Sequence, residues 1–118
     1  GSNVFIGKGS VIMAGVKINA GAVIKNHCIL NTNSVLDHDC VMNDYSSLAP
    51  NSTAGGEVNI GKYSAIGLGA SILHKRKIGD NCIIGSGSVV TKSTKDNSIY
   101  YGIPAKFSKE RKLGEKYL

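Results

Sequence analysis

Apolar residues recur at every sixth position over most of the chain. Starting at Ile6, fifteen consecutive positions of this register are apolar, although apolar residues make up only 42% of the composition. They are Ile6, Ile12, Ile18, Ile24, Leu30, Leu36, Met42, Leu48, Ala54, Ile60, Ile66, Ile72, Ile78, Ile84 and Val90. Random filling would produce this run with a probability of about two in a million, so the pattern indicates a hexapeptide repeat.

A second register, four residues further on, is filled almost entirely by short side chains. Its members are Ser10, Val16, Ala22, Cys28, Ser34, Cys40, Ser46, Ser52, Val58, Ser64, Ala70, Arg76, Cys82, Ser88 and Thr94, of which only Arg76 is long. The residues around the two registers are rich in Gly and Asn, which adopt positive φ at low cost and so favour tight bends. Short strands joined by such bends predict an all-β solenoid, in which each coil of three hexads covers the next.

A helical fold does not fit this pattern. A period of six is incompatible with 3.6 residues per turn, and each glycine would cost a helix about 1 kcal/mol. At 118 residues the chain is expected to form one domain. We expect a repeat of about five coils over residues 1–95, followed by a strand and a capping tail over residues 96–118. The strand is placed at Asp96 to Tyr101, and the basic tail after Pro104 can form a helix.

Composition narrows the range of partners. The net charge of +6 leaves open a solvated surface or an anionic small molecule, but scattered lysines and 6% aromatic residues argue against nucleic acid. No run of about 18 apolar residues and no signal-peptide pattern is present, so no membrane partner is expected. Cys28, Cys40 and Cys82 all fall in the inward register of short side chains. Cys28 and Cys82 share a face but lie roughly 14 Å apart, too far for a disulfide, and Cys40 lies on another face. We expect reduced core cysteines and a cytoplasmic location.

One short segment stands out chemically. His38 is flanked by Asp37 and Asp39, at a turn position that the register directs outward. A carboxylate beside an imidazole fixes its tautomer and raises its basicity, as a general base requires. The alternative is a cluster of solvated charges. His74 falls in the same column two coils on, about 10 Å away, and His27 lies on another face, so no three-histidine metal site is expected.

Three features leave alternatives open. Arg76 occupies an inward position, so either the coil bulges there or the side chain points outward. The basic run His74–Lys77 is either a solvated turn or a receptor for phosphate groups. The segment from Asp44 to Ile60, with Pro50 and Gly55–Gly56, is either a small loop at a cleft or a slightly irregular coil.

Four features together carry a resemblance to a known family. They are the hexapeptide register, His27–Thr32, Asp37–Val41 and Gly102–Lys106. From Val11 to Lys106 the chain resembles the left-handed β-helix acetyltransferases that act on nucleotide-linked amino sugars and on sialic acid. The resemblance implies a left-handed parallel β-helix, acetyl-CoA as the donor without a metal, a sugar nucleotide as acceptor, and a homotrimer with active sites between neighbouring prisms.

The resemblance also implies roles for individual residues. His38 matches the catalytic base, and Asp39, with Asp37 on its other side, matches the supporting carboxylate. Asn31 and Thr32 match acceptor-binding positions, and the coenzyme A contacts fall on Ser47, Gly67, Leu68, Ser86 and Lys106. Two departures are evident: members often carry a further histidine where this chain has Ser47, and usually an N-terminal nucleotide-binding domain. We expect the acceptor-binding half to be missing or supplied elsewhere.

Two hypotheses follow. In the first, His38 takes a proton from the amine or hydroxyl of the sugar while a backbone N–H from a neighbouring coil stabilises the oxyanion. In the second, the chain is a trimeric β-helix scaffold, or a truncated fragment, that binds coenzyme A without turnover. The acceptor sugar and the choice between N- and O-acetylation are open at this point.

Overall fold

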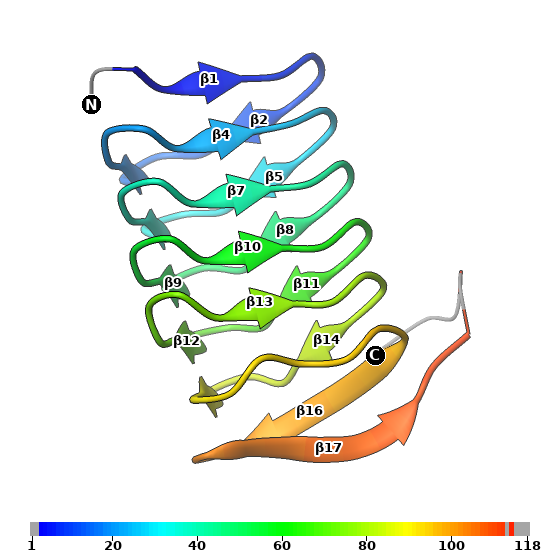
Figure 1. Cartoon of the computed structure of the whole chain (residues 1–118). Helices are drawn as coiled ribbons and strands as arrows, with labels where there is room; N and C mark the ends of the chain where they lie inside the picture. The colour runs from blue at the N-terminus through cyan, green and yellow to red at the C-terminus, as the bar shows by residue number, and fades with distance from the viewer. Residues whose placement is uncertain (1–2, 113, 115–118) are drawn as a thin grey trace.

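The computed structural model describes residues 3–112 and 114, which form three sheets built mainly from two-residue strands (Figure 1). Sheet A contains β1 (Phe5–Ile6), β4 (Val23–Ile24), β7 (Val41–Met42), β10 (Asn59–Ile60) and β13 (Lys77–Ile78). Sheet B contains β2 (Val11–Ile12), β5 (Ile29–Leu30), β8 (Ser47–Leu48), β11 (Ala65–Ile66), β14 (Ile83–Ile84), β16 (Ser98–Gly102) and β17 (Ala105–Glu110). Sheet C contains β3 (Lys17–Ile18), β6 (Val35–Leu36), β9 (Thr53–Ala54), β12 (Ser71–Ile72) and β15 (Val89–Val90).

Parallel pairing between residues eighteen apart sets the register of the coils. Val23 pairs with Val41 in sheet A, and Ala65 pairs with Ile83 in sheet B. Eighteen residues are three hexads, so each coil contributes one strand to each sheet. The chain therefore forms the left-handed β-helix of about five coils that the sequence predicts.

Four-residue corners join the sheets, and each kind of corner stacks into a column. The A–B corner comprises residues 7–10, 25–28, 43–46, 61–64 and 79–82. The B–C corner comprises residues 13–16, 31–34, 49–52, 67–70 and 85–88, and the C–A corner residues 19–22, 37–40, 55–58 and 73–76. The third residue of every corner has positive φ, which explains why Gly and Asn recur there.

The core lies inside the coils and is formed by the sixth-position side chains. Those of the middle coils, such as Leu36 and Ile60, have no exposed surface, whereas Ile6 is 47% exposed because the first coil is covered on one side only. Cys28, Cys40 and Cys82 are buried and unbonded to one another, as expected. No helix in the described part of the chain is long and apolar enough to cross a membrane.

The C-terminal segment confirms one expectation and corrects another. The strand expected near Asp96 to Tyr101 is β16, which adds to sheet B alongside β14. The tail expected to allow a helix is instead β17, antiparallel to β16. A helix there would leave the edge of β16 unpaired, whereas β17 pairs with it and places Phe107 edge-on against Tyr100, with ring centroids 6.0 Å apart. Residues 113 and 115–118 of the expected tail lie outside the described residues.

Two of the open alternatives are resolved by the coils themselves. Arg76 bridges two coils: its Nε donates to the Thr91 carbonyl of the next coil at 2.9 Å, and an Nη donates to the His74 carbonyl of its own corner at 3.0 Å. The flanking strands pair without a register shift, so no bulge forms. The segment from Asp44 to Ile60 is a regular coil and neither a loop nor an irregularity, and Ala54 in its core position is fully buried.

Candidate active site

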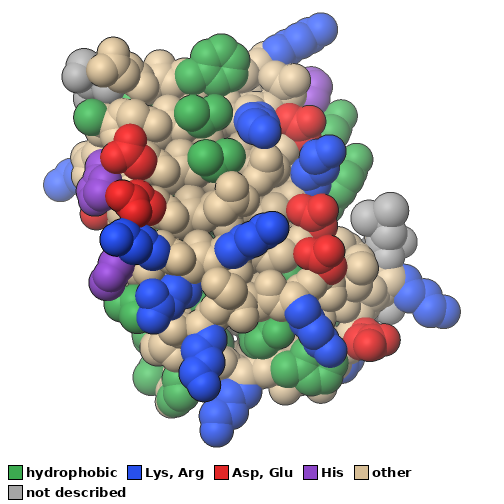
Figure 2. All heavy atoms as spheres, in the orientation of Figure 1, with side chains coloured by type: hydrophobic (Ala, Val, Ile, Leu, Met, Phe, Trp, Pro, Cys, Tyr) green, Lys and Arg blue, Asp and Glu red, His purple; other side chains and the backbone are tan. Residues whose placement is uncertain are grey.

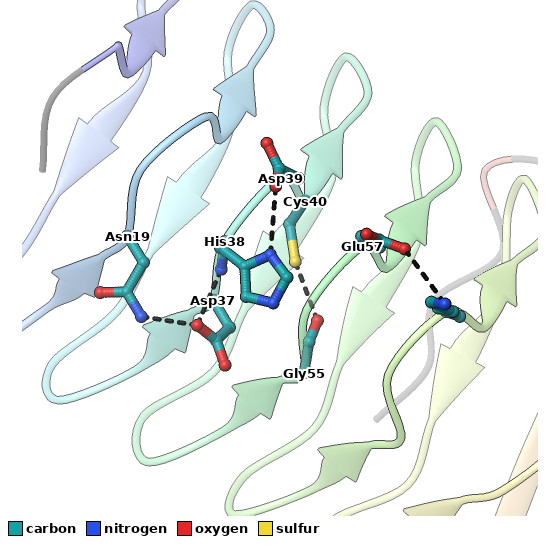
Figure 3. Close-up of polar contacts among 8 residues, drawn as sticks. Asn19, Asp37, His38, Asp39, Cys40, Gly55 and Glu57 are labelled. Carbon is teal, nitrogen blue, oxygen red and sulfur yellow. Dashed lines mark hydrogen bonds and ion pairs between the residues drawn. The ribbon is translucent and has the colours of Figure 1, made fainter.

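His38 lies on the C–A corner directly after β6, and its side chain is 55% exposed (Figure 3). Asp37 stabilises the backbone at this corner: its Oδ1 accepts the His38 backbone N–H at 2.8 Å and the Asn19 side-chain amide, from the preceding coil, at 2.6 Å. These hydrogen bonds, the one from Asn19 first, lower the pKa of the Asp37 carboxyl. Asp37 therefore fixes the backbone of His38 and not the orientation of its imidazole ring.

Asp39 contacts the imidazole itself. Its Oδ2 lies 3.1 Å from His38 Nδ1, and its backbone is held at φ 55° with the N–H donating to the Ala20 carbonyl at 3.0 Å. The hydrogen bond to Asp39, followed by the nearby charges of Asp37 and Glu57, raises the pKa of His38 above its ordinary value of 6.5. With Nδ1–H donated to the carboxylate, Nε2 is the nitrogen that accepts a proton.

The other side of the ring faces Gly56 on the next coil. A Cβ added to Gly56 would overlap Nε2 and lie 2.8 Å from Cε1, so only glycine leaves room for the imidazole in this position. The backbone N–H of Gly56 has no hydrogen-bond partner among the described residues. At the A–B corner, the equivalent N–H of Lys62 donates to the Asp80 carboxylate at 2.9 Å. The site thus combines a proton-accepting nitrogen with an unpaired backbone donor beside it.

Glu57 is a third acidic neighbour that the sequence analysis did not identify. One ligand atom each from His38, Asp39 and Glu57 lies within 4.8 Å of the others, and all three residues are exposed. The carboxylate of Glu57 also lies 3.9 Å from Lys75 Nζ. Such a group has the ligand types that a divalent cation accepts. Its sequence signal is the spacing of eighteen residues between Asp39 and Glu57.

The other expected site residues lie away from the C–A corner, on the B–C corner or on sheet B. Asn31 and Thr32 are on the B–C corner, where the Asn31 amide donates to the Leu48 carbonyl at 2.9 Å. Ser47, expected to contact the coenzyme, is the half-buried outward residue of β8 in sheet B. Within one chain, then, the expected acceptor and coenzyme residues are separated from His38 by the width of sheet C.

The B–C corner does bring two expected coenzyme residues together. Gly67 and Ser86 line a shallow cavity of about 160 Å³, together with Ile83, Ile84, Gly85 and Tyr101. Leu68 is 53% exposed beside it, and Lys106 pairs with Tyr101 across the β16–β17 hairpin. Sequence reasoning missed Gly85 and Tyr101. Gly85 follows Gly67 by eighteen residues, and the Tyr101 ring lies where a Gly85 side chain would begin.

Residues 1–32 and 57–92, more than half of the chain, match the family model described as bacterial transferase hexapeptide (six repeats). The chain belongs to the bacterial transferase hexapeptide family. Among solved structures, it is similar to the acetyltransferase domain of PglB from Neisseria gonorrhoeae in complex with acetyl coenzyme A. The sequence identity is 33% and the TM-score 0.90, covering 92% of this chain and 53% of that one.

Two further known proteins are similar to this chain. PerB from Caulobacter crescentus, solved in complex with CoA and GDP-perosamine, is 37% identical with a TM-score of 0.91, covering 92% of this chain and 53% of that one. A probable acetyltransferase of Mycobacterium tuberculosis is 43% identical over 56 residues, which are 48% of this chain and 19% of that protein. The chain therefore spans about half the length of the two solved structures and about a fifth of the curated relative.

The chain presents two chemically different corners. The C–A corner carries the imidazole and its carboxylates, whereas the B–C corner has no charged side chain in any of its five turns. An uncharged wall with glycines and a shallow cavity suits the approach of a long, thin ligand, and the C–A corner suits proton transfer. The cavity is well below the volume of about 300 Å³ that is typical of a small-molecule site, so by itself it does not enclose a ligand of that size.

Proposed function

We propose that this chain is the catalytic β-helix of an acetyltransferase that moves the acetyl group of acetyl-CoA to the amine of a nucleotide-linked sugar, with His38 as general base. The observation that carries the proposal is the arrangement at His38, where Asp39 engages Nδ1 and leaves Nε2 beside the unpaired Gly56 N–H. The solved relatives support the substrate class, because one is in complex with acetyl coenzyme A and the other with CoA and GDP-perosamine.

The reaction can be followed atom by atom at this corner. The amine nitrogen attacks the acetyl carbonyl carbon and its proton passes to His38 Nε2, while Asp39 stabilises the imidazolium through Nδ1. The carbonyl oxygen becomes an oxyanion, which the Gly56 N–H, without a hydrogen-bond partner among the described residues, can stabilise. As the C=O bond re-forms, the C–S bond breaks and the leaving thiolate takes the proton back from His38. No metal is needed in this sequence.

The proposed site requires a second copy of the chain. His38 is on the C–A corner, whereas Asn31, Thr32, Ser47 and the cavity at Gly67 are on the B–C side. A homotrimer in which the C–A corner of one prism faces the B–C corner of the next would bring the two halves together, as the family resemblance implies. Lys106, exposed on β17 beside the cavity, is then placed to contact a phosphate of coenzyme A.

A cytoplasmic location is part of the proposal. The three buried thiols are free, as in proteins of reducing compartments, and Cys40 and Cys82 have pKa values raised by burial, which keeps them protonated and unreactive.

The decisive experiment is thiol release from acetyl-CoA across a panel of GDP-, UDP- and dTDP-linked amino sugars and sialic acid, using the wild type and His38→Ala. We expect kcat to fall by at least about a hundredfold, as for other general bases. His38→Gln, which keeps the size of the side chain but cannot accept the proton, should be equally impaired. Lys17→Ala, exposed on β3, is the control and should retain wild-type activity.

Two outcomes would contradict the proposal. An unchanged rate in His38→Ala would remove His38 as the base. Binding of acetyl-CoA by calorimetry without turnover on any acceptor would favour the scaffold or fragment hypothesis instead. Turnover with sialic acid alone would indicate that the acceptor group is a hydroxyl and not an amine.

A further inference from the structure

An exposed ladder of aromatic side chains runs along the A–B corner, away from the site described above. His27, Tyr45 and Tyr63 stack on successive coils, with ring centroids 5.0 and 5.1 Å apart and planes inclined by 19° and 1°. Tyr45 is 52% exposed and Tyr63 49% exposed. In Figure 1 this corner is the column of turns that follow the arrowheads of sheet A.

The backbone under the ladder is of a kind that bulky residues rarely adopt. His27, Tyr45 and Tyr63 have φ values of 58°, 62° and 60°. At the same position of other corners the chain has mostly Gly or Asn, for example Asn33 and Asn51, which take this conformation at lower cost. The turns do not need tyrosine, and strained positions of this kind tend to persist where a surface has a function.

The stacking itself indicates what the ladder can contact. Each ring covers a face of the next, so the ladder does not present the open faces on which sugars or bases stack. It exposes ring edges and the two tyrosine hydroxyls instead. Tyrosine edges with a polar tip are enriched where one protein surface packs against another. The ladder therefore fits a protein partner.

The division of the proposed site identifies that partner as further copies of this chain. The C–A and B–C corners are the two ends of sheet C, and the A–B corner lies opposite sheet C in the triangular cross-section. A threefold axis beside the A–B corner brings the C–A corner of each copy next to the B–C corner of the following copy. An axis on the side of sheet C would bury those two corners at the centre and close the cleft.

We infer that the A–B corner is the axial contact of the homotrimer, with the His27–Tyr45–Tyr63 ladders of three copies meeting along the axis. This inference rests on the proposed function, because it uses the division of that site between two corners. It specifies which surface assembles the active site, and it makes Tyr45 and Tyr63 assembly residues remote from the chemistry.

The surfaces flanking the corner agree with this arrangement. On the face shown in Figure 2, hydrophobic side chains gather over the N-terminal strands of sheet A, where Phe5 is 58% exposed. On sheet B, Val11 and Ile29 are 47% and 44% exposed. The column beside the ladder carries charges of both signs, including Asp44 and Lys62. In a cyclic trimer, one side of the A–B corner of each copy contacts the opposite side of the A–B corner of the next copy. Such a head-to-tail contact can pair these charged side chains with the tyrosines of the next copy.

The test is the solution mass of the double variant Tyr45→Asn/Tyr63→Asn, measured by sedimentation or light scattering. Asparagine already occupies this corner position at Asn33 and Asn51, so the circular dichroism spectrum should not change. We expect a trimer for the wild type and, for the double variant, a monomer or a trimer dissociation constant at least tenfold higher. Lys17→Asn is the control, since Lys17 is exposed on β3 of sheet C, which lies opposite the A–B corner, and this variant should stay trimeric.

A second variant covers the case in which the double variant fails to fold. Tyr45→Lys places one positive charge per copy beside the axis, at a backbone position where lysine already occurs in this chain, and it should dissociate the trimer at low salt more than at high salt. A wild type that is not a trimer, or variants that remain trimeric, would overturn the inference. An inactive wild-type trimer that the variants dissociate would reject the proposed function alone, whereas active variants that remain trimeric would reject the inference alone.

Discussion

The imidazole of His38 occupies the space that a side chain of Gly56 would fill on the next coil. Gly56 follows His38 by eighteen residues, so the parallel register of the coils places one above the other. Gly56 is not at positive φ, which means that its backbone would accept alanine. Glycine is therefore required at position 56 by the space that the His38 ring occupies, and not by the backbone conformation of the turn.

The first prediction uses this relationship. Gly56→Ala should displace the His38 ring and reduce kcat by about tenfold or more, because a small misplacement of a catalytic group is costly. The melting temperature should change little, since the exposed ring can rotate away. Gly55→Ala is the contrasting variant: its Cβ would lie 2.9 Å from the His74 backbone nitrogen and 3.0 Å from the Ile72 carbonyl oxygen, so it should lower the melting temperature. Equal effects of both variants on stability would contradict this assignment.

The second prediction concerns pH. Activity requires neutral His38, so kcat/KM should fall as the pH drops through the His38 pKa. Because Asp39 raises that pKa above 6.5, the midpoint of the acidic limb should lie above 6.5. Asp39→Asn removes the charged acceptor, so the midpoint should move to lower pH while the maximal rate falls. In Asp37→Asn the amide oxygen can still accept the His38 N–H, and the midpoint should shift less. If the acidic limb of the pH profile does not move in Asp39→Asn, the limb reports the titration of a group other than His38.

The third prediction tests how the coils stabilise one another. Ile60 and Ile6 occupy the same core register on sheet A, but Ile60 is fully buried and Ile6 is 47% exposed. Ile60→Ala should reduce the free energy of unfolding by about 2–5 kcal/mol, as for other buried truncations. Ile6→Ala should cost about 1 kcal/mol or less, because no coil covers it in this chain. Denaturant unfolding of both variants gives the comparison, and similar losses would indicate that the first coil is covered.

The repeat made His38 predictable and Glu57 hard to see. A register of six assigns each residue to the core or to a corner, so the outward position of His38 followed from counting alone. Glu57 approaches His38 only across the stack of coils. The spacing of eighteen residues contains that information, but Glu57 has no acidic neighbour in sequence to attract notice. Gly85 likewise follows Gly67 by eighteen residues, whereas Tyr101 reaches the cavity from β16, which pairs with β14 at a spacing of sixteen residues.

Arg76 and the C-terminal tail show a different limit. An arginine in a core register conflicts with the pattern, and only the positions of the Thr91 and His74 carbonyls decide where its guanidinium goes. The tail from Phe107 onward is too short to form a stable helix by itself. The conformation of residues 105–110 is determined by β16, whose free edge offers backbone hydrogen bonds along its length.

By itself, the sequence determined the coil. A strict six-residue period with small inward residues and positive-φ corners admits one way to bury its isoleucines and leucines, and that winding directs His38 and its two aspartates outward. The tertiary structure decided which corners carry which chemistry, because a corner is assembled from residues eighteen positions apart that no local motif connects. It placed the base on one end of sheet C, the uncharged cavity on the other and an aromatic ladder opposite both, since stacking turns a period along the chain into columns in space.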